Sequence, residues 1–207
     1  MIVTKVVSCT KTKFKVDLDG AFAFVLYKGE LSKFGLQEGA EIPEETVEKI
    51  RNEVILKRAK LRAMHLLEDM DRTEAALREK LRQGLYPSDI VDAAVAYVKS
   101  FGYLNDERYA ENFVRSRQGT KSRQEIRAAL MQKGLTSEQI SSAFEACSDC
   151  GETDGEAAAV RNILRKKRFD PETADEAGLQ KIYAYLGRKG FRYDTVRQVI
   201  QNYNMDA

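Results

Sequence analysis

The sequence predicts a mainly α-helical protein in which a small N-terminal antiparallel β extension precedes three tandem three-helix repeats. Three patterns support this prediction: apolar residues alternate with period two over residues 1–40, recur at helical spacing after Pro43, and form a frame that is written three times. Because such repeats stack on their neighbours, we expect an elongated, curved array. We expect the β extension at residues 1–42 and the first repeat with its leading helix at 43–104. The second repeat is expected at 105–147, and a linker with the third repeat at 148–207.

The first 40 residues have the composition and alternation of β-strands. Runs at 3–7, 14–18 and 22–26 are rich in β-branched and aromatic residues, which favour strands. Asp19-Gly20 between two runs predicts a tight hairpin turn, since glycine tolerates the positive φ that this turn requires. We therefore expect about three strands. These strands could pack on the first repeat, extend a partner contact, or pair with another chain through an exposed edge.

From Pro43 onward the apolar residues follow a helical period. Proline suits the first turn of a helix, where its missing N–H would have no partner, and Val47, Ile50 and Val54 follow at helical steps. The sequence shows no convincing strand pattern beyond this point. We expect the first helices of the three repeats at about 54–69, 106–117 and 155–167.

The internal repeat is the most informative feature of the sequence. Each copy has a leucine four residues after another apolar residue, then a short polar link, a glycine and the apolar stripe of a further helix. The leucines and glycines are Leu81 with Gly84, Leu130 with Gly134, and Leu186 with Gly190, so the first link is one residue shorter. Because each glycine falls where a helix ends, we expect all three to adopt the left-handed conformation of a helix C-cap.

Two helix starts carry a recognisable capping signal. Ser122 with Glu125 and Thr136 with Gln139 fit the capping box, in which the two side chains satisfy free backbone N–H groups.

Composition and charge exclude several classes of protein. The 207 residues contain 34 Lys and Arg against 32 Asp and Glu, a net charge of +2, so any nucleic-acid-binding surface must arise from local clustering. No apolar run is long enough to cross a membrane or to form a signal peptide, and three cysteines do not make a disulfide framework. We therefore expect a cytoplasmic protein that does not contact a membrane.

The sequence offers little for catalysis. The one histidine, His65, lies in a helical stretch and is expected at or near the surface, and no Gly-rich phosphate loop is present. Cys147 and Cys150 form a lone C-x-x-C without a second ligand pair, and residues 148–155 have the composition of a linker. We expect no enzymatic activity, no cofactor and no metal site.

Basic residues cluster near the first helix of each repeat. The first basic cluster comprises Lys57, Arg58, Lys60 and Arg62. The second basic cluster comprises Arg115, Arg117, Lys121, Arg123 and Arg127. The third basic cluster comprises Arg161, Arg165, Lys166, Lys167 and Arg168. A single such charge is ordinary on a solvated helix, and cations near a helix C-terminus favour the helix dipole. Three clusters at equivalent repeat positions instead predict a stripe complementary to DNA phosphates or to an acidic groove in a protein filament.

Four segments resemble the RecX family of recombinase regulators. They are Phe101-Gly102-Tyr103-Leu104-Asn105-Asp106-Glu107-Arg108-Tyr109-Ala110, Gln132-Lys133-Gly134-Leu135, Arg188-Lys189-Gly190-Phe191 and, at the opening of the first repeat, Arg72-Thr73-Glu74. The resemblance covers residues 54–203 in the family's order, and residues 1–40 resemble an extension found in only some members.

The resemblance implies a non-enzymatic regulator, in most members an inhibitor, of the RecA recombinase. Members consist of three tandem three-helix repeats that lie in the groove of the RecA filament on DNA, where they block ATP hydrolysis and strand exchange or promote filament loss. It further implies a role in DNA recombination, DNA repair and the SOS response. The expected partner is the RecA filament, and DNA would be bound weakly or through that filament. The regulator is expected to be a monomer.

The residues alone leave a second function open. Paired helices joined by a glycine turn resemble helix-turn-helix units, and basic side chains give salt-dependent phosphate binding. The chain could therefore be a sequence-tolerant DNA-binding module that acts without a recombinase.

Overall fold

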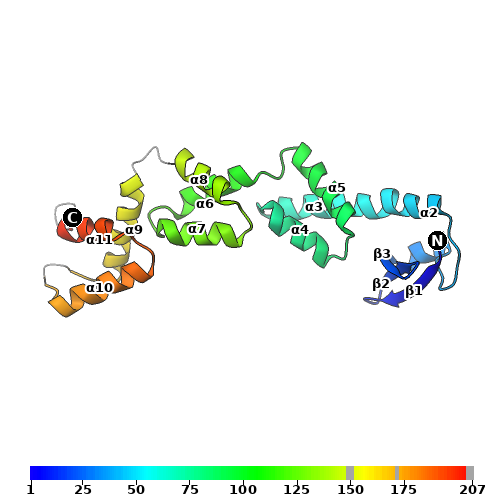
Figure 1. The fold of residues 1–207 in the computed structure, drawn as a ribbon, viewed down its shortest axis with the longest axis horizontal. Helices are drawn as coiled ribbons and strands as arrows, with labels where there is room; N and C mark the ends of the chain where they lie inside the picture. The colour runs from blue at the N-terminus through cyan, green and yellow to red at the C-terminus, as the bar shows by residue number, and fades with distance from the viewer. Residues whose placement is uncertain (148–151, 171–172, 204–207) are drawn as a thin grey trace. The chain divides into compact units, whose positions relative to one another are not determined.

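The computed structural model describes residues 1–147, 152–170 and 173–203, with side chains described from residue 155 in the second range (Figure 1). The chain is mainly helical, and a three-stranded antiparallel sheet lies at its N-terminus, which confirms the predicted fold class. Its internal contacts divide it into two compact units, Met1–Asn105 and Asp106–Ala207.

The sheet of the first unit is a simple meander. Strands β1 (Val3–Ser8), β2 (Lys13–Leu18) and β3 (Ala21–Tyr27) pair in the order β1-β2-β3. Asp19 and Gly20 have φ of 48° and 83°, the geometry that a two-residue hairpin loop needs to match the strand twist. The predicted strands and hairpin turn are confirmed.

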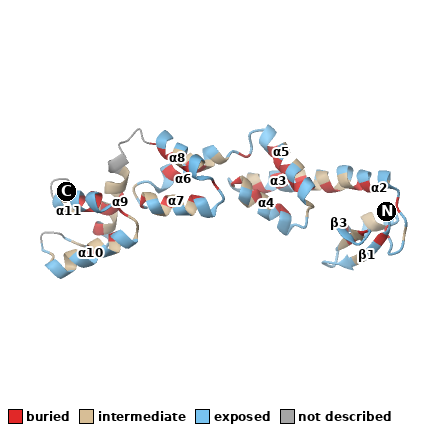
Figure 2. Cartoon of the chain, viewed as in Figure 1, coloured by how far each residue is buried: buried red, intermediate tan, exposed pale blue. Residues whose placement is uncertain are grey.

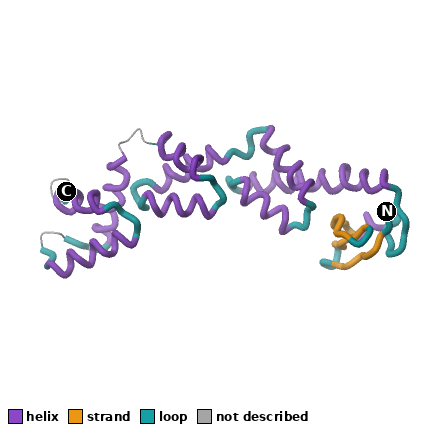
Figure 3. The backbone as a smooth tube through the Cα atoms, in the orientation of Figure 1, coloured by secondary structure: helices purple, strands orange, loops and turns teal. Residues whose placement is uncertain are grey.

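One long helix leads into the first repeat. The helices of this unit are α1 (Lys28–Phe34), α2 (Glu44–Lys49), the π-helical η1 (Ile50–Leu56), α3 (Lys57–Asp69), α4 (Glu74–Gln83) and α5 (Ser88–Ser100). The junction residues Ile50 and Lys57 keep right-handed helical φ of −59° and −58°, so α2, η1 and α3 run on without a break (Figure 3). The helix start at Pro43 is confirmed, and the helix expected at about 54–69 is α3, which begins three residues later at Lys57 and continues directly from η1.

The π-helical stretch has a packing reason. Ile50 and Ile55 are five residues apart and both are buried. A π-helix hydrogen-bonds residues five apart and so brings such a pair toward one face, whereas an α-helix would separate them. The stretch therefore turns both isoleucines into the core.

The sheet and the first repeat share one hydrophobic core. Val16, Phe24 and Leu26 of the sheet belong to the same buried cluster as Ile50 of η1 and Leu77 of α4. Figure 2 shows buried stretches on the strands and on the helices of this unit. A small sheet is marginally stable alone, and here the helices cover one of its faces. Of the three roles that the sequence left open for the strands, packing on the first repeat is the one observed.

The second unit contains two three-helix bundles, each with its own core. The bundles consist of α6 (Asp106–Arg117), α7 (Arg123–Gln132) and α8 (Ser137–Ala146), and of α9 (Glu152–Lys166), α10 (Glu176–Arg188) and α11 (Tyr193–Gln201). Val114, Ile126 and Leu130 lie in the first core, and Leu164 and Leu186 lie in the second. The helix predicted at 106–117 is confirmed, and the one predicted at 155–167 begins three residues earlier, at Glu152.

The left-handed residue of each repeat turn is a glycine in two of the three repeats. Gly134 and Gly190 have φ of 87° and 79°, as predicted. Gly84 instead has φ of −76°, and its neighbour Leu85 is left-handed with φ of 59°. The prediction for Gly84 is therefore wrong.

The reason is a constant distance from a buried leucine. In every repeat the left-handed residue lies four positions after that leucine, and the pairs are Leu81 with Leu85, Leu130 with Gly134, and Leu186 with Gly190. The next residue donates its N–H to the leucine carbonyl, at N···O distances of 3.3, 3.3 and 3.1 Å in the three repeats. This is the Schellman arrangement of a helix C-terminus. The shorter first link places Gly84 one position too early to occupy it.

Gly84 has a different role. A Cβ added at Gly84 would lie 3.0 Å from a ring carbon of Tyr86 and 3.1 Å from the carbonyl oxygen of Leu81. Glycine at this position therefore leaves space for the Tyr86 ring.

Replacing Gly134 with valine should lower the free energy of unfolding by about 2 kcal/mol, because a β-branched residue is strained at positive φ. Urea denaturation followed by circular dichroism measures the change. A wild-type unfolding midpoint would contradict the left-handed assignment at Gly134.

Leu85→Gly should have the opposite effect. Leu85 is exposed and left-handed, so glycine removes backbone strain at little cost in burial and should stabilise the chain by about 1 kcal/mol. The same denaturation experiment tests it, with Gly84→Ala as a control that should destabilise. A loss of stability in Leu85→Gly would show that Leu85 contributes more by packing than it costs in strain.

Candidate functional site

The second basic cluster surrounds the junction between α6 and α7. Arg115 and Arg117 lie in the last turn of α6, where their charges favour the helix dipole. Arg117 lies over the Phe113 ring at 5.6 Å, and Arg115 forms an ion pair with Glu111 at 3.4 Å one helical turn away. Both arginine side chains are exposed. This junction therefore presents two cations at the surface.

The remaining members of the cluster lie where α7 begins. Lys121 is exposed and contacts Glu125 at 3.5 Å, whereas Arg127 is half-buried. The guanidinium of Arg123 lies 4.5 Å from the Phe144 ring centroid, so this arginine also covers the core of its repeat. The structure therefore brings the five predicted residues to one junction, but Arg123 has a packing role as well.

The N-terminus of α7 is fixed by a buried hydroxyl. Ser122 is fully buried, and its Oγ accepts the N–H of Glu125 at 3.1 Å. The Glu125 carboxylate accepts the N–H of Ser122 at 3.5 Å in return. The second predicted capping box, Thr136 with Gln139, forms at the start of α8 with distances of 3.2 and 2.9 Å. Both capping predictions are confirmed.

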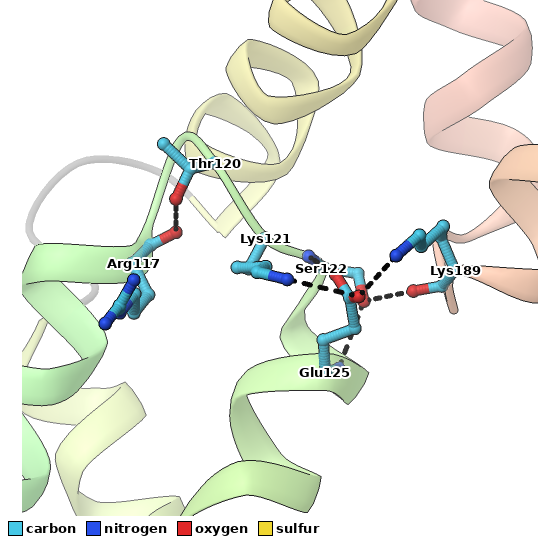
Figure 4. Close-up of polar contacts among 6 residues, drawn as sticks. All are labelled: Arg117, Thr120, Lys121, Ser122, Glu125 and Lys189. Carbon is cyan, nitrogen blue, oxygen red and sulfur yellow. Dashed lines mark hydrogen bonds and ion pairs between the residues drawn. The ribbon is translucent and has the colours of Figure 1, made fainter.

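Ser122 also joins the second repeat to the third. Its hydroxyl donates to the carbonyl oxygen of Lys189 at 2.6 Å, and Lys189 ends α10 (Figure 4). The Lys189 ammonium lies 3.2 Å from the same Glu125 oxygen that Lys121 contacts. The partially negative C-terminus of α10 thus meets the partially positive N-terminus of α7, an arrangement that both helix dipoles favour.

Further contacts hold the loop between α6 and α7. The Thr120 hydroxyl donates to the Arg117 carbonyl at 3.0 Å (Figure 4), and the Asn162 amide donates to the Gly119 carbonyl at 2.8 Å from α9. A Cβ at Gly190 would lie 2.8 Å from the Cβ of Gln124, so glycine is needed for this close approach as well as for positive φ. The backbone that carries the second basic cluster is therefore fixed by the third repeat.

The third basic cluster lies at the end of α9. Arg165, Lys166, Lys167 and Arg168 are exposed, and Arg161 is half-buried. The Lys167 ammonium lies 4.0 Å from the Tyr185 ring centroid, and Arg168 is left-handed with φ of 51°.

The first basic cluster belongs to the other compact unit. Arg58 pairs with Glu30, donates to the Val25 carbonyl at 3.2 Å and lies over the Tyr27 ring at 4.6 Å. The Lys60 ammonium lies 4.5 Å from the Tyr97 ring centroid. Arg58 and Lys60 therefore hold α3 to its neighbours, whereas Lys57 and Arg62 are exposed.

The Arg72-Thr73-Glu74 opening has a structural role. Thr73 is buried and caps α4 by accepting the Ala76 N–H at 3.2 Å. Glu74 accepts hydrogen bonds from Lys99 at 2.7 Å and from Arg78 at 2.8 Å. The hydrogen bond from Lys99, with support from Arg78, holds the pKa of Glu74 below its ordinary value. This network ties α4 to α5.

The residues considered for chemistry are one histidine and two cysteines. Among the described residues, no group of three or more His, Cys, Asp or Glu side chains is placed to hold a metal ion. His65 is exposed, 3.5 Å from Glu68, and Cys147 is buried. Cys150 and residues 148–151 of the expected linker lie outside the described residues. Residues 152–155 of that linker belong to α9, so the linker prediction is wrong there. None of the described helices has both the length and the apolarity needed to span a membrane.

Sequence reasoning missed Glu125 and Lys189 as part of this site. Ser122 with Glu125 signals a helix cap, but their contacts with Lys189 join residues 67 and 64 positions apart. A local pattern carries no information about such a pair.

The three helical repeats match three family models. These are described as the first, second and third three-helix domains of RecX, and they match residues 59–97, 105–143 and 154–200. A regulatory protein RecX from Caldanaerobacter subterraneus subsp. tengcongensis is 29% identical, with 97% of this chain and 98% of that protein aligned. One from Trichlorobacter lovleyi is 32% identical, with 68% of this chain and 92% of that protein aligned.

Two crystal structures share the fold. That of a regulatory protein RecX superimposes with a TM-score of 0.62 at 24% identity, covering 97% of this chain and 98% of the other. That of RecX from Lactobacillus salivarius gives a TM-score of 0.61 at 22% identity, covering 72% and 97%. At these identities the likeness shows the fold.

Ser122→Ala should lower the free energy of unfolding by about 2 to 3 kcal/mol, because it removes a helix cap and leaves the Lys189 carbonyl without its donor. Thr136→Ala is the matched control, since it removes a capping box formed at the start of α8 within the second repeat, and it should cost about 1 kcal/mol. Chemical denaturation of both variants measures the difference. Equal losses would contradict a role for Ser122 in joining the repeats.

Proposed function

Since the chain belongs to the RecX family of regulatory proteins, we propose that it regulates a RecA recombinase by binding in the groove of the RecA-DNA filament. Bound there, it competes with duplex DNA for the groove and holds the recombinase subunits in a poor geometry for turnover. The result is inhibition of ATP hydrolysis and strand exchange. The regulator acts as a monomer in the cytoplasm, in DNA recombination, DNA repair and the SOS response, and needs no cofactor or catalysis of its own.

The observation that supports filament binding most directly is the second basic cluster. The side chains of Arg115 and Lys121 are 59% and 46% exposed. The segment between α6 and α7 is held by two hydrogen bonds with the third repeat, one donated by Ser122 to the Lys189 carbonyl and one accepted by the Gly119 carbonyl from Asn162. A cationic surface on a fixed backbone loses little conformational entropy when it binds. It also favours encounter with an acidic or phosphate-rich partner.

The other clusters supply cations of the same kind. Lys57 and Arg62 in the first repeat and Arg165, Lys166 and Arg168 in the third are exposed. We propose that each repeat offers its exposed cations to the same filament. Arg58, Lys60 and Arg123 contribute by shaping these surfaces, because each also lies over an aromatic ring of this chain.

The direct test measures RecA-catalysed, DNA-dependent ATP hydrolysis and strand exchange with increasing amounts of this protein. Both rates should fall. Arg115→Glu with Arg117→Glu should raise the concentration needed for half-inhibition by about tenfold, because reversing interface charges costs on the order of 1 to 2 kcal/mol. Arg123 is left unchanged because its replacement would uncover Phe144.

Lys181→Glu with Arg197→Glu is the matched control, since both residues are exposed in the second unit and lie outside the basic clusters. This pair should change the half-inhibitory concentration by less than about twofold. Unchanged rates at saturating, independently measured binding would reject inhibition. Equal weakening by both pairs would reject the second cluster as the contact surface.

A further inference from the structure

A surface pocket of about 550 Å³ lies in the first compact unit and includes Arg58 and Arg62 of the first basic cluster. Lys13 of β2, Tyr27 of β3, Arg62 of α3 and Lys80 of α4 all contribute to its lining. The turn after α4 contributes Tyr86. Segments far apart in the sequence thus form one concave site between the sheet and the first repeat.

The lining of this pocket has one sign of charge. It includes Lys13, Arg58, Arg62 and Lys80, and none of the described residues that line it is acidic. Glu30 pairs with Arg58 but does not belong to the lining. Lys13, Arg62 and Lys80 are exposed and supply the remaining positive charge. Concave walls of one charge sign focus the field and concentrate ions of the opposite sign.

Two tyrosines give the pocket an aromatic surface. Tyr27 is 38% exposed, and the Arg58 guanidinium lies over its ring, 4.6 Å from the centroid. Tyr86 is half-buried, and its ring packs against the Gly84 backbone. Burial raises the pKa of the Tyr86 hydroxyl, so this group stays protonated and can donate a hydrogen bond to an anionic oxygen.

We propose that this pocket binds a segment of single-stranded DNA, with phosphates at Lys13, Arg62 and Lys80 and a base against the Tyr27 ring. Cations beside exposed aromatic rings are the usual means of holding single strands without sequence preference. The pocket volume is in the range that accepts a small organic ligand such as one splayed nucleotide. The stacked bases of a duplex could not enter it. The choice of DNA over RNA rests on the proposed function, whereas the phosphate and base contacts do not.

The experiment measures binding to bare DNA without any recombinase, so that its outcome is separate from that of the ATPase test. Fluorescence anisotropy with a labelled oligothymidylate of about 12 nucleotides is followed between about 50 and 200 mM salt. Lys13→Gln, Arg62→Gln and Lys80→Gln together should weaken binding by about 30-fold. They should also lower the slope of log affinity against log salt by about 2, since each single-strand phosphate contact contributes about 0.7.

A second triple variant removes the same charge elsewhere. Lys5→Gln, Lys33→Gln and Lys49→Gln replace exposed lysines of the same unit that do not line the pocket, and affinity should fall by less than about threefold. Equal losses in the two triple variants, or no loss in the pocket variant, would overturn the site. Thermal melting of each variant checks that the fold is retained, and Arg62→Gln alone should still weaken binding by about threefold.

Competition identifies the ligand. Unlabelled oligothymidylate should displace the probe at the lowest concentration. Equal displacement by duplex DNA of the same length would overturn a single-strand site, and equal displacement by thymidine monophosphate would show a mononucleotide site instead. Equal displacement by oligouridylate would overturn the choice of DNA.

Discussion

The architecture depends on a chain reversal at a fixed distance from a buried leucine. The helices on either side of each reversal are short, at 9 to 13 residues, and helices of this length are marginal in isolation. Their stability must come from packing two apolar stripes against each other, which requires the reversal to occur in one register. The leucine carbonyl sets that register by accepting the N–H five residues later in all three repeats.

The same constraint operates at the end of α9, where no glycine is present. Leu164 is fully buried, its carbonyl accepts the Phe169 N–H at 3.0 Å, and Arg168 takes the left-handed position four residues after it. Leu85 and Arg168 show that the hydrogen-bond register, rather than the residue type, decides which position becomes left-handed. Glycine at that position lowers the strain but does not create the turn.

This difference explains what the sequence could and could not predict. The helix at 106–117 and the caps at Ser122 and Thr136 were predictable because their signals are local: apolar period, capping side chains and charges at the helix ends. The conformation of Gly84 was not predictable from its identity as a glycine, because the position four residues after the buried leucine becomes left-handed, and in the first repeat that position is Leu85. Similarly, the sequence shows where basic residues cluster, but it could not show that Arg58 forms an ion pair with Glu30, 28 residues earlier.

Contacts such as these divide the cations of a nearly neutral chain into two groups. Arg58, Arg78 and Lys189 pair with the carboxylates of Glu30, Asp92 and Glu125 and so join one element to another. Arg62, Arg117 and Arg168 are instead exposed. At physiological salt a charge acts over about 8 Å, so a binding partner senses the local group of cations and not the net charge of +2. A chain with almost balanced charge can therefore present strongly cationic surfaces, provided that its carboxylates are engaged in holding the scaffold. The near-neutral composition and the proposed binding to a nucleoprotein filament are compatible for this reason.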